Sequence, residues 1–290
     1  MARHEAGRHM ARRTIVITGA SDGIGAAAAR ALATDGHEVV VVGRSPEKTA
    51  AVARELGADH FVADFARLAE VRALAAQLRD RYERIDVLAN NAGGIMADRQ
   101  VSEDGHELTF QVNHLAPFLL TTLLLDRLEE SHASVISTSS AAHRLFSDFH
   151  VDDLESERSY APNTAYGNAK LAVNLFTREL DRRYRAAGIA AASFHPGVVA
   201  TNFAATSTSS MRVMYQTVLS RFLTSSTKGA DTLVWLATTT PGVDWEPGSY
   251  YVKRKVATTH PLVGDPRLAA ELWERSAAMV ADDDAPGAAA

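Results

Sequence analysis

Tyr166 and Lys170 are a tyrosine and a lysine four residues apart, within a segment that has helical spacing, 164–187. Residues at this separation project from one face of a helix, one turn from each other. A phenol ionises near pH ~10 and is a weak acid or base at neutral pH, but a neighbouring ammonium favours the phenolate. The pair can therefore donate a proton to a developing alkoxide or take one from an alcohol. Neither Tyr160 nor Tyr184 has a lysine at this spacing, although such a pair alone is most often only part of a helix surface.

Two further polar positions suit the same reaction. The run Ser137–Ser140 ends a predicted strand, and a hydroxyl at the carboxyl end of a strand faces the crevice where open α/β sheets bind ligands. Such a hydroxyl can donate to a substrate carbonyl. Asn113 is a polar residue within an apolar helical pattern, FQVNHLAPF. Taken alone, the first is a serine-rich loop and the second a satisfied buried amide.

A glycine-rich segment near the N-terminus predicts a phosphate-binding loop. Residues 18–25 read TGASDGIG, directly after a predicted strand and directly before a predicted helix. Three glycines in such a turn let the backbone approach a pyrophosphate, whose charge then lies at a helix N-terminus. Three glycines can also form only a tight turn, and the flanking strand and helix are what favour the cofactor loop. The predicted contacts are Gly19, Ser21, Asp22, Gly23, Ile24 and Gly25.

The residues after the second predicted strand bear on which cofactor binds. NAD enzymes of this architecture carry an acidic residue here that accepts hydrogen bonds from the adenosine ribose. This sequence has Gly43 and Arg44 instead, and the forked donors of a guanidinium suit a 2′-phosphate. The absence of the acid is the stronger observation, since a surface arginine is expected anywhere in an arginine-rich chain. The sequence therefore favours NADP(H) over NAD(H), although Asp22 places a carboxylate in the phosphate loop and weakens that preference.

Two more loops follow strands at the same predicted sheet edge. Asp64 and Phe65 come after the third strand, where a carboxylate can accept from the adenine amino group. The residues 90–93, NNAG, follow the fourth strand, and Asn91, Ala92 and Gly93 are predicted to contact the cofactor. As isolated residues, both groups would be interpreted as turn formers.

The elements that position these residues alternate between short strands and longer helices. The strands are nearly all apolar rather than alternating, which is typical of a parallel sheet buried on both faces. Repeated alternation predicts right-handed βαβ units and a Rossmann-like, doubly wound α/β fold of about seven strands in a single domain. The predicted strands are 14–18, 38–42, 60–63, 86–90, 134–137 and 191–194, and the predicted helices are 24–34, 46–56, 68–81, 106–130 and 164–187.

The last third of the chain is less regular. Apolar residues at helical spacing within the Ser/Thr-rich segment 201–226 are consistent with a core helix, but its place after the sixth strand predicts a mobile lid over the substrate. Residues 248–252 can add a seventh strand and 268–280 a final helix. The domain is predicted to span 13–281, with a flexible arm at 1–12 and a disordered tail at 282–290.

Composition limits the class of protein. The 290 residues carry a formal net charge of −5, so the chain lacks the excess of positive charge that is typical of nucleic-acid-binding proteins. The sequence contains no cysteine, so disulfides and thiolate zinc sites are excluded, and the dispersed histidines and carboxylates predict no metal site. No secretory signal or membrane anchor is visible, so we expect a cytoplasmic protein, with Met1 or Met10 as its start.

Together these motifs resemble the short-chain dehydrogenase/reductase family, in order and in spacing, over nearly the whole chain. In that family the Tyr is the general acid/base, the Lys activates it and holds the nicotinamide ribose, the Ser polarises the carbonyl and the Asn positions a water. The resemblance assigns these roles to Tyr166, Lys170, Ser140 and Asn113, and implies that a loop with Pro196, Gly197, Val199 and Thr201 orients the nicotinamide amide. It rests on TGASDGIG, Asp64, NNAG, Asn113, Ser140, Y-x-x-x-K and P-G-x-x-x-T.

Within the family the sequence is similar to the retinol-dehydrogenase-like branch. The likeness lies in NNAGGIM, VNHLAPFLLT, SSAAH and HPGVV, and in the 26 positions from Ser140 to Tyr166, which also favour Ser140 over Ser139 as the carbonyl donor. Branch members usually reduce lipophilic aldehydes or ketones, often with NADPH. The membrane anchors of many animal relatives are absent from this sequence, so a retinoid substrate does not follow.

We therefore expect an NADPH-dependent carbonyl reductase, reversible as an alcohol dehydrogenase, acting on a hydrophobic small molecule. Two alternatives are a nonenzymatic NADP-binding sensor or interaction protein, and a C=C reductase of the protochlorophyllide-reductase type. The first is disfavoured because all four catalytic positions are filled, and the second because those relatives rely on cysteines. The long helices 106–130 and 164–187 have apolar faces that permit a homodimer or homotetramer.

Overall fold

The computed structural model describes residues 12–197 and 225–281. In this part of the chain, eight strands form one sheet in the order β3-β2-β1-β4-β5-β6-β7-β8. All neighbouring strands are parallel except β7 and β8, which are antiparallel. The α/β class and the parallel sheet are therefore confirmed. The strands are β1 (Thr14–Thr18), β2 (Glu38–Gly43), β3 (Asp59–Val62), β4 (Val87–Asn90), β5 (Ser134–Thr138), β6 (Ala190–His195), β7 (Tyr250–Val252) and β8 (Lys255–Val256).

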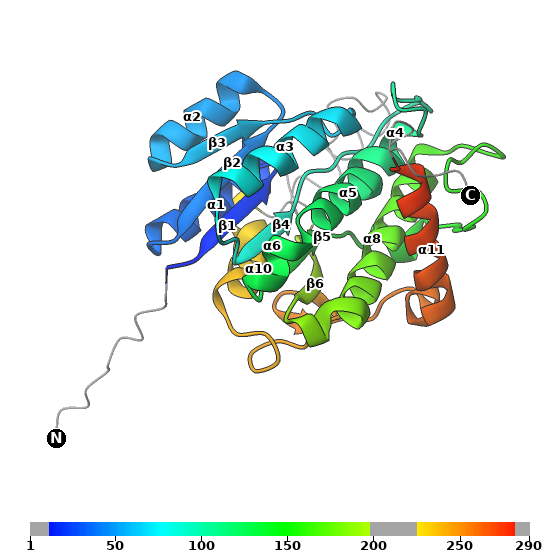
Figure 1. Cartoon of the computed structure of the whole chain (residues 1–290). Helices are drawn as coiled ribbons and strands as arrows, with labels where there is room; N and C mark the ends of the chain where they lie inside the picture. The colour runs from blue at the N-terminus through cyan, green and yellow to red at the C-terminus, as the bar shows by residue number, and fades with distance from the viewer. Residues whose placement is uncertain (1–11, 198–224, 282–290) are drawn as a thin grey trace, which may run out of the picture.

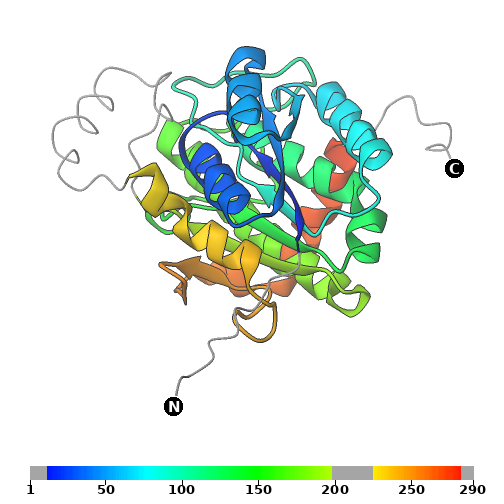
Figure 2. The same ribbon diagram turned by 90° about the vertical axis from the view of Figure 1, so that its left-hand side faces the viewer.

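The sheet lies between two layers of helices, each with its own apolar core (Figures 1 and 2). The central strands are buried on both faces, which is why their sequences are almost continuously apolar. One layer contains α1 (Gly23–Thr34), α2 (Pro46–Leu56) and α10 (Ser226–Thr238). The other contains α3 (Leu68–Arg81), α5 (Ala116–Leu123), α6 (Leu125–Glu130), α8 (Pro162–Tyr184) and α11 (Pro266–Met279).

The single helix predicted over 106–130 is wrong. The structure has a short helix α4 (Leu108–Phe110), a π-helical turn η1 (Gln111–Leu115) and then the helices α5 and α6. Pro117 explains the wide turn, because it has no N–H to donate to the carbonyl of Asn113 four residues earlier. The break between α5 and α6 falls at Leu124, whose backbone leaves the helical region.

Two elements near the C-terminus were not predicted. Helix α10 begins at Ser226, capped by the hydroxyl of Ser225, which accepts from the backbone N–H of Lys228. The two-residue strand β8 follows a tight turn in which Lys253 and Arg254 have positive φ. The predicted lid lies outside the described residues, apart from its last two positions, and so do the predicted arm, except Arg12, and the predicted tail.

Candidate functional site

The sequence-predicted site residues that the structure describes lie at one edge of the sheet. Strands β1 to β6 run parallel, so their carboxyl ends, and the loops that follow them, meet at the same edge. The strand order changes direction between β1 and β4, and crevices at such a point bind ligands in open α/β sheets. The loops brought together follow β1, β2, β3, β4, β5 and β6.

The loop after β1 has the conformation that its glycines allow. Gly19 and Gly23 have φ of +65° and +57°, a region that other residues rarely adopt. At Gly25, a Cβ would lie 2.4 Å from the carbonyl oxygen of Gly19, so a side chain there would push the loop away from helix α1. The carboxylate of Asp22 caps that helix by accepting from the N–H of Gly23 at 2.7 Å. Ser21 and Ile24 are half-buried in the same turn.

Asn91 fastens the strand ends to one another. Its side-chain amide donates to the carbonyl oxygen of Thr18 at 2.9 Å, and its amide oxygen accepts from the hydroxyl of Thr138 at 3.1 Å. The Thr18 hydroxyl in turn accepts from the N–H groups of Asn91 and Ala92, both at 3.0 Å. These bonds hold the ends of β1, β4 and β5 together, so the Asn91 side chain is engaged by the protein itself.

Gly93 is the point where two of the predicted catalytic residues, Asn113 and Lys170, come together. A Cβ at this position would lie 2.6 Å from Oδ1 of Asn113 and 3.3 Å from Nζ of Lys170. The Asn113 amide donates to the carbonyl oxygens of Gly94 and Thr109, each at 2.7 Å, and its Oδ1 accepts from the Gly94 N–H at 3.2 Å. The π-helical turn thus holds Asn113 against the loop after β4.

Lys170 and Tyr166 lie together on helix α8. Lys170 Nζ is 5.5 Å from the centre of the Tyr166 ring and donates to the carbonyl oxygen of Thr138 at 2.9 Å. Only 2% of Lys170 is exposed, and this burial lowers its pKa to about 7. The lysine therefore exchanges its proton close to neutral pH, beside a half-buried tyrosine.

The two candidate serines face different ways. Ser139 is buried, and its hydroxyl donates to the carbonyl oxygen of Lys170 at 3.3 Å. Ser140 is only half-buried, and its Oγ accepts from the N–H of Ala142 at 3.2 Å in the first turn of α7 (Ala142–Leu145). Because that bond uses a lone pair of Oγ, the hydroxyl hydrogen of Ser140 can turn to another acceptor.

This arrangement agrees with the comparisons with known proteins. A family model described as short chain dehydrogenase matches residues 13–212. The chain belongs to the short-chain dehydrogenase family. It is 45% identical over 277 residues to a Streptomyces sp. (strain C5) protein named as a daunorubicin C-13 ketoreductase, DnrU, with 93% of each chain covered. It is 34% identical over 291 residues to human retinol dehydrogenase 13, covering 92% of this chain and 84% of the relative.

A solved structure supports the same conclusion. A protein of unassigned function from Mycobacterium paratuberculosis has a TM-score of 0.75 and 32% identity to this short-chain dehydrogenase, with 93% and 94% of the two chains covered. The predicted retinol-dehydrogenase-like branch is thus confirmed by the relatives. The chain is an NAD(P)-dependent oxidoreductase that acts on CH–OH and C=O groups.

The other predicted cofactor contacts of the dehydrogenase differ in accessibility. Arg44 is exposed and has no hydrogen bond or ion pair within residues 12–197 and 225–281. Asp64 is half-buried and accepts from the N–H of Ala66 at 3.0 Å. The Phe65 side chain is packed in the core, so only its backbone faces the loop. Pro196 and Gly197 follow β6, and Gly197 has φ of +87°, whereas Val199 and Thr201 lie outside the described residues.

His143 is a residue near the dehydrogenase site whose role the sequence did not indicate. Its Nδ1 bonds to the carbonyl oxygen of Ser140, and its ring packs edge-on against Tyr250 with ring centres 4.9 Å apart. The ring is buried, which lowers the pKa of His143, so the neutral ring donates from Nδ1. His143 therefore fixes the backbone that carries the candidate carbonyl donor. The feature of the sequence that could have pointed to this role is its position, three residues after Ser140.

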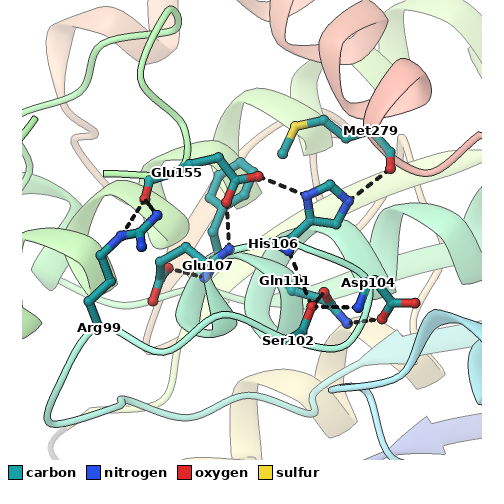
Figure 3. Close-up of polar contacts among 9 residues, drawn as sticks. Arg99, Ser102, Asp104, His106, Glu107, Gln111, Glu155 and Met279 are labelled. Atoms are coloured by element: carbon teal, nitrogen blue, oxygen red, sulfur yellow. Dashed lines mark hydrogen bonds and ion pairs between the residues drawn. The ribbon is translucent and has the colours of Figure 1, made fainter. Parts of the chain in front are cut away.

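A second set of contacts fastens the long loop between Ser140 and Tyr166 (Figure 3). Glu155, in that loop, faces Nδ1 of His106 at 2.8 Å and accepts from the backbone N–H of Glu107. The other ring nitrogen of His106 lies 2.9 Å from the carbonyl oxygen of Met279, at the end of α11. Arg99 donates to the Glu155 carbonyl oxygen at 3.1 and 3.2 Å. We call His106, Glu155 and Met279 the histidine clamp.

Among residues 12–197 and 225–281, no group of three or more histidine, aspartate or glutamate residues is placed to hold a metal ion. The helices of residues 12–197 and 225–281 also include none with the length and apolar character needed to cross a bilayer.

Proposed function

We propose that this short-chain dehydrogenase is an NADPH-dependent carbonyl reductase, reversible as an alcohol dehydrogenase, with a hydrophobic aldehyde or ketone as substrate. The observation that carries the proposal is the approach of Lys170 and Asn113 to the backbone of Gly93, with the Tyr166 ring 5.5 Å from the Lys170 ammonium. A proton-transfer group, its activating ammonium and a bound amide are thus neighbours at the edge of the sheet where the strands end.

The loops at this edge fit a dinucleotide. The loop backbone lies close to the start of α1, where a pyrophosphate would be held. This approach depends on the absence of a side chain at Gly25 and on the positive φ of Gly19 and Gly23. Arg44 offers an exposed, unpaired guanidinium among the described residues, suited to a 2′-phosphate. Both observations support NADP(H), with the sequence-predicted residues as its contacts.

The reduction is assigned to two side chains, those of Ser140 and Tyr166. The bound nicotinamide would supply hydride to the carbonyl carbon. Ser140 donates its free hydroxyl hydrogen to the substrate oxygen and so stabilises the negative charge that grows there. Tyr166 then gives its proton to that oxygen, and in the direction of oxidation it takes a proton from the alcohol.

Lys170 and Asn113 are assigned to the return of the proton from solvent. The Lys170 ammonium stabilises the phenolate that remains after Tyr166 has given up its proton, and a pKa of about 7 lets it exchange protons at neutral pH. The main-chain carbonyl of Asn113 receives no bond from Pro117, so it is the acceptor that we assign to a water of the relay. Lys170 would also hold the nicotinamide ribose.

Apolar side chains beside Ser140 support a hydrophobic substrate. Leu145 and Phe146, at the end of α7, are 69% and 47% exposed. The same turn packs on α8 next to Tyr166, since a Cβ at Gly167 would lie 2.9 Å from the carbonyl carbon of Phe146. Large exposed apolar side chains next to a polar reaction centre are typical of a site that binds lipophilic molecules.

The test is consumption of NADPH, with NADH in parallel, against a panel of aromatic and lipophilic aldehydes and ketones. We expect turnover with NADPH to exceed that with NADH. Tyr166→Phe serves as the matched variant, because it should lose turnover by about 10²-fold or more while binding NADPH as the parent does. Full activity of Tyr166→Phe would overturn the assigned chemistry, and no binding of either cofactor would overturn the proposal as a whole.

A further inference from the structure

A small cavity lies where the ends of β4 and β5 meet the π-helical turn and helix α8. Its volume is about 10 Å³, and one water molecule needs roughly 10–15 Å³. A water in a protein interior also needs at least two polar partners. The polar residues that line this cavity are Asn90, Asn113, His114, Ser137 and Thr138. The cavity therefore has the size and the lining of a site for a single water molecule.

Asn90, the last residue of β4, has a side-chain oxygen without a partner. Its amide nitrogen donates to the hydroxyl of Thr121 at 2.9 Å, and that hydroxyl donates to the carbonyl oxygen of Pro117 at 2.7 Å. Because the Thr121 hydrogen is used on Pro117, the hydroxyl can only accept from Asn90, which fixes the orientation of the amide. Oδ1 of Asn90 is buried and has no hydrogen-bond partner among residues 12–197 and 225–281.

One ring nitrogen of His114 is buried in the same way. Nε2 lies 2.8 Å from the hydroxyl of Ser276, on α11, but Nδ1 has no partner in the described part of the chain. The ring is enclosed by three aromatic side chains, with centres 4.9 to 6.2 Å away, Phe110, Phe118 and Phe176. Burial lowers the pKa of His114 to about 3, so the ring is neutral and Nδ1 either donates or accepts one bond. Buried polar atoms that the protein does not pair are usually bonded to ordered water.

We propose that the cavity binds one water molecule, held by Oδ1 of Asn90 and Nδ1 of His114, and that these two side chains are positioning residues for the site. A water can donate to Oδ1 and still serve either tautomer of the ring, since it has two donors and two acceptors. Asn90 precedes the loop that contains Gly94, and His114 follows Asn113 in the π-helical turn. The water would therefore join the same two segments as the hydrogen bonds between Asn113 and Gly94. Through this second connection the two side chains keep Asn113 in place.

The water is tested by a high-resolution crystal structure of the full-length protein. We expect an ordered water at about 2.7–3.2 Å from both Oδ1 of Asn90 and Nδ1 of His114. Electron density without a water bonded to both atoms would overturn the inference. This experiment does not depend on catalysis, whereas the positioning role rests on the proposed function. A parent protein that reduces no carbonyl compound would contradict the proposed function and leave the crystallographic result to decide on the water.

The positioning role is tested by two variants of His114 that each keep one polar position of the ring. The amide of His114→Asn lies near the position of Nδ1, so this variant should keep the water and lose the bond to Ser276. The longer side chain of His114→Gln reaches the position of Nε2, so it should keep the bond to Ser276 and lose the water. One lost hydrogen bond changes the population of a conformation by up to about tenfold, so kcat of His114→Gln should fall by about that factor. The KM for the carbonyl substrate and the Kd of NADPH should stay within about twofold, because neither ligand contacts His114.

His114→Asn and the matched control Ser276→Ala should keep kcat within about threefold, since both retain the water contact. Thermal unfolding of each variant sets a common assay temperature at which all are folded. Equal losses of kcat in the two His114 variants would overturn the positioning role, because packing alone would then explain them. A loss in Ser276→Ala as large as that in His114→Gln would overturn it too, because the bond to α11 would then be the cause.

A second pair of variants keeps the test decisive if the substitutions at His114 prevent folding. Asn90→Ala removes the other side chain that holds the water, so kcat should fall by up to about tenfold. Thr121→Val removes the bond between Thr121 and Asn90 but keeps Oδ1, so kcat should stay within about threefold. An unchanged kcat in Asn90→Ala, or equal losses in the two variants, would overturn the positioning role.

Discussion

The histidine clamp predicts a pH-dependent contribution to stability. Both ring nitrogens of His106 face acceptors, the carboxylate of Glu155 at 2.8 Å and the carbonyl oxygen of Met279 at 2.9 Å. A ring can donate from both nitrogens only as the imidazolium. The hydrogen bond to Glu155 accordingly raises the pKa of His106 more than burial lowers it, and the charges of Glu155 and Asp104 act in the same direction.

The sign of the effect follows from that raised pKa. The unfolded chain has His106 at its ordinary pKa near ~6.5. The clamp therefore contributes fully below that pH and loses its contribution as the pH rises through the higher pKa of the folded state. Once neutral, His106 has one donor for two acceptors, and one of the two bonds is lost.

The perturbation is His106→Gln, which keeps one donor and cannot titrate. A hydrogen bond to a charged group contributes about 1.5–3 kcal/mol, and the clamp side chains are only 15% and 23% exposed, so little is lost to solvent. We expect the variant to be about 2 kcal/mol less stable at pH 6, which lowers Tm by about 4–8 °C in a domain of this size. At pH 9 the two proteins should melt within about 2 °C of each other.

The assay is thermal unfolding of parent and variant from pH 5.5 to 9.5, with only the difference in Tm compared at each pH. His150→Gln is the matched control. His150 belongs to the same loop and faces Asp148 at 3.2 Å, but the pair is 58% and 78% exposed. Its substitution should change Tm by little at any pH. A difference for His106→Gln that stays constant or grows with pH would refute the imidazolium interpretation.

Three further predictions concern the site. Ser140→Ala should lower kcat by about 10²–10³-fold while Ser139→Ala stays within a few-fold, and equal losses would contradict the assignment of the donor. Gly25→Ala should destabilise the fold by about 1–3 kcal/mol in urea titrations and weaken cofactor binding, because its Cβ meets the Gly19 carbonyl oxygen at 2.4 Å. Lys170→Met should abolish turnover yet raise the free energy of unfolding by about 2 kcal/mol at pH 7. This gain should shrink toward pH 10, because Lys170 binds its proton less tightly in the folded protein than in the unfolded chain. A gain that grows with pH would refute this reasoning.

The parts of the fold that follow from local patterns were predictable. Helix α2 runs from Pro46 to Leu56 as predicted, because Ser45 caps it, proline occupies its first position and Gly57 ends it in the left-handed region. The apolar strands fixed the parallel sheet, and hence the edge at which the site lies. The family motifs then placed the predicted catalytic side chains on the loops and on α8.

The features that could not be predicted depend on contacts between segments that are far apart in the sequence. His106, Glu155 and Met279 are far apart in the sequence, and nothing local to any of them indicates that they meet. Phe65 was assigned to the cofactor from its place after β3, but its side chain is taken up by the core. Asn91 was assigned in the same way, and its amide is bonded to the strand ends. Position after a strand predicts the neighbourhood of a site, but not which atoms face the ligand. The predicted dimer or tetramer stays a prediction.

The π-helical turn at Gln111–Leu115 makes the chain intolerant of a change in length at this point. Each residue of an α-helix advances the direction of the side chains by about 100°. Deleting one residue here would turn the segment into regular helix and rotate the residues before it by that angle relative to α5. Asn113 would then leave the Gly94 backbone, or the apolar face of α5 would leave the sheet. Insertions and deletions should therefore be tolerated in the surface loops of this dehydrogenase. Within these five residues they should abolish activity.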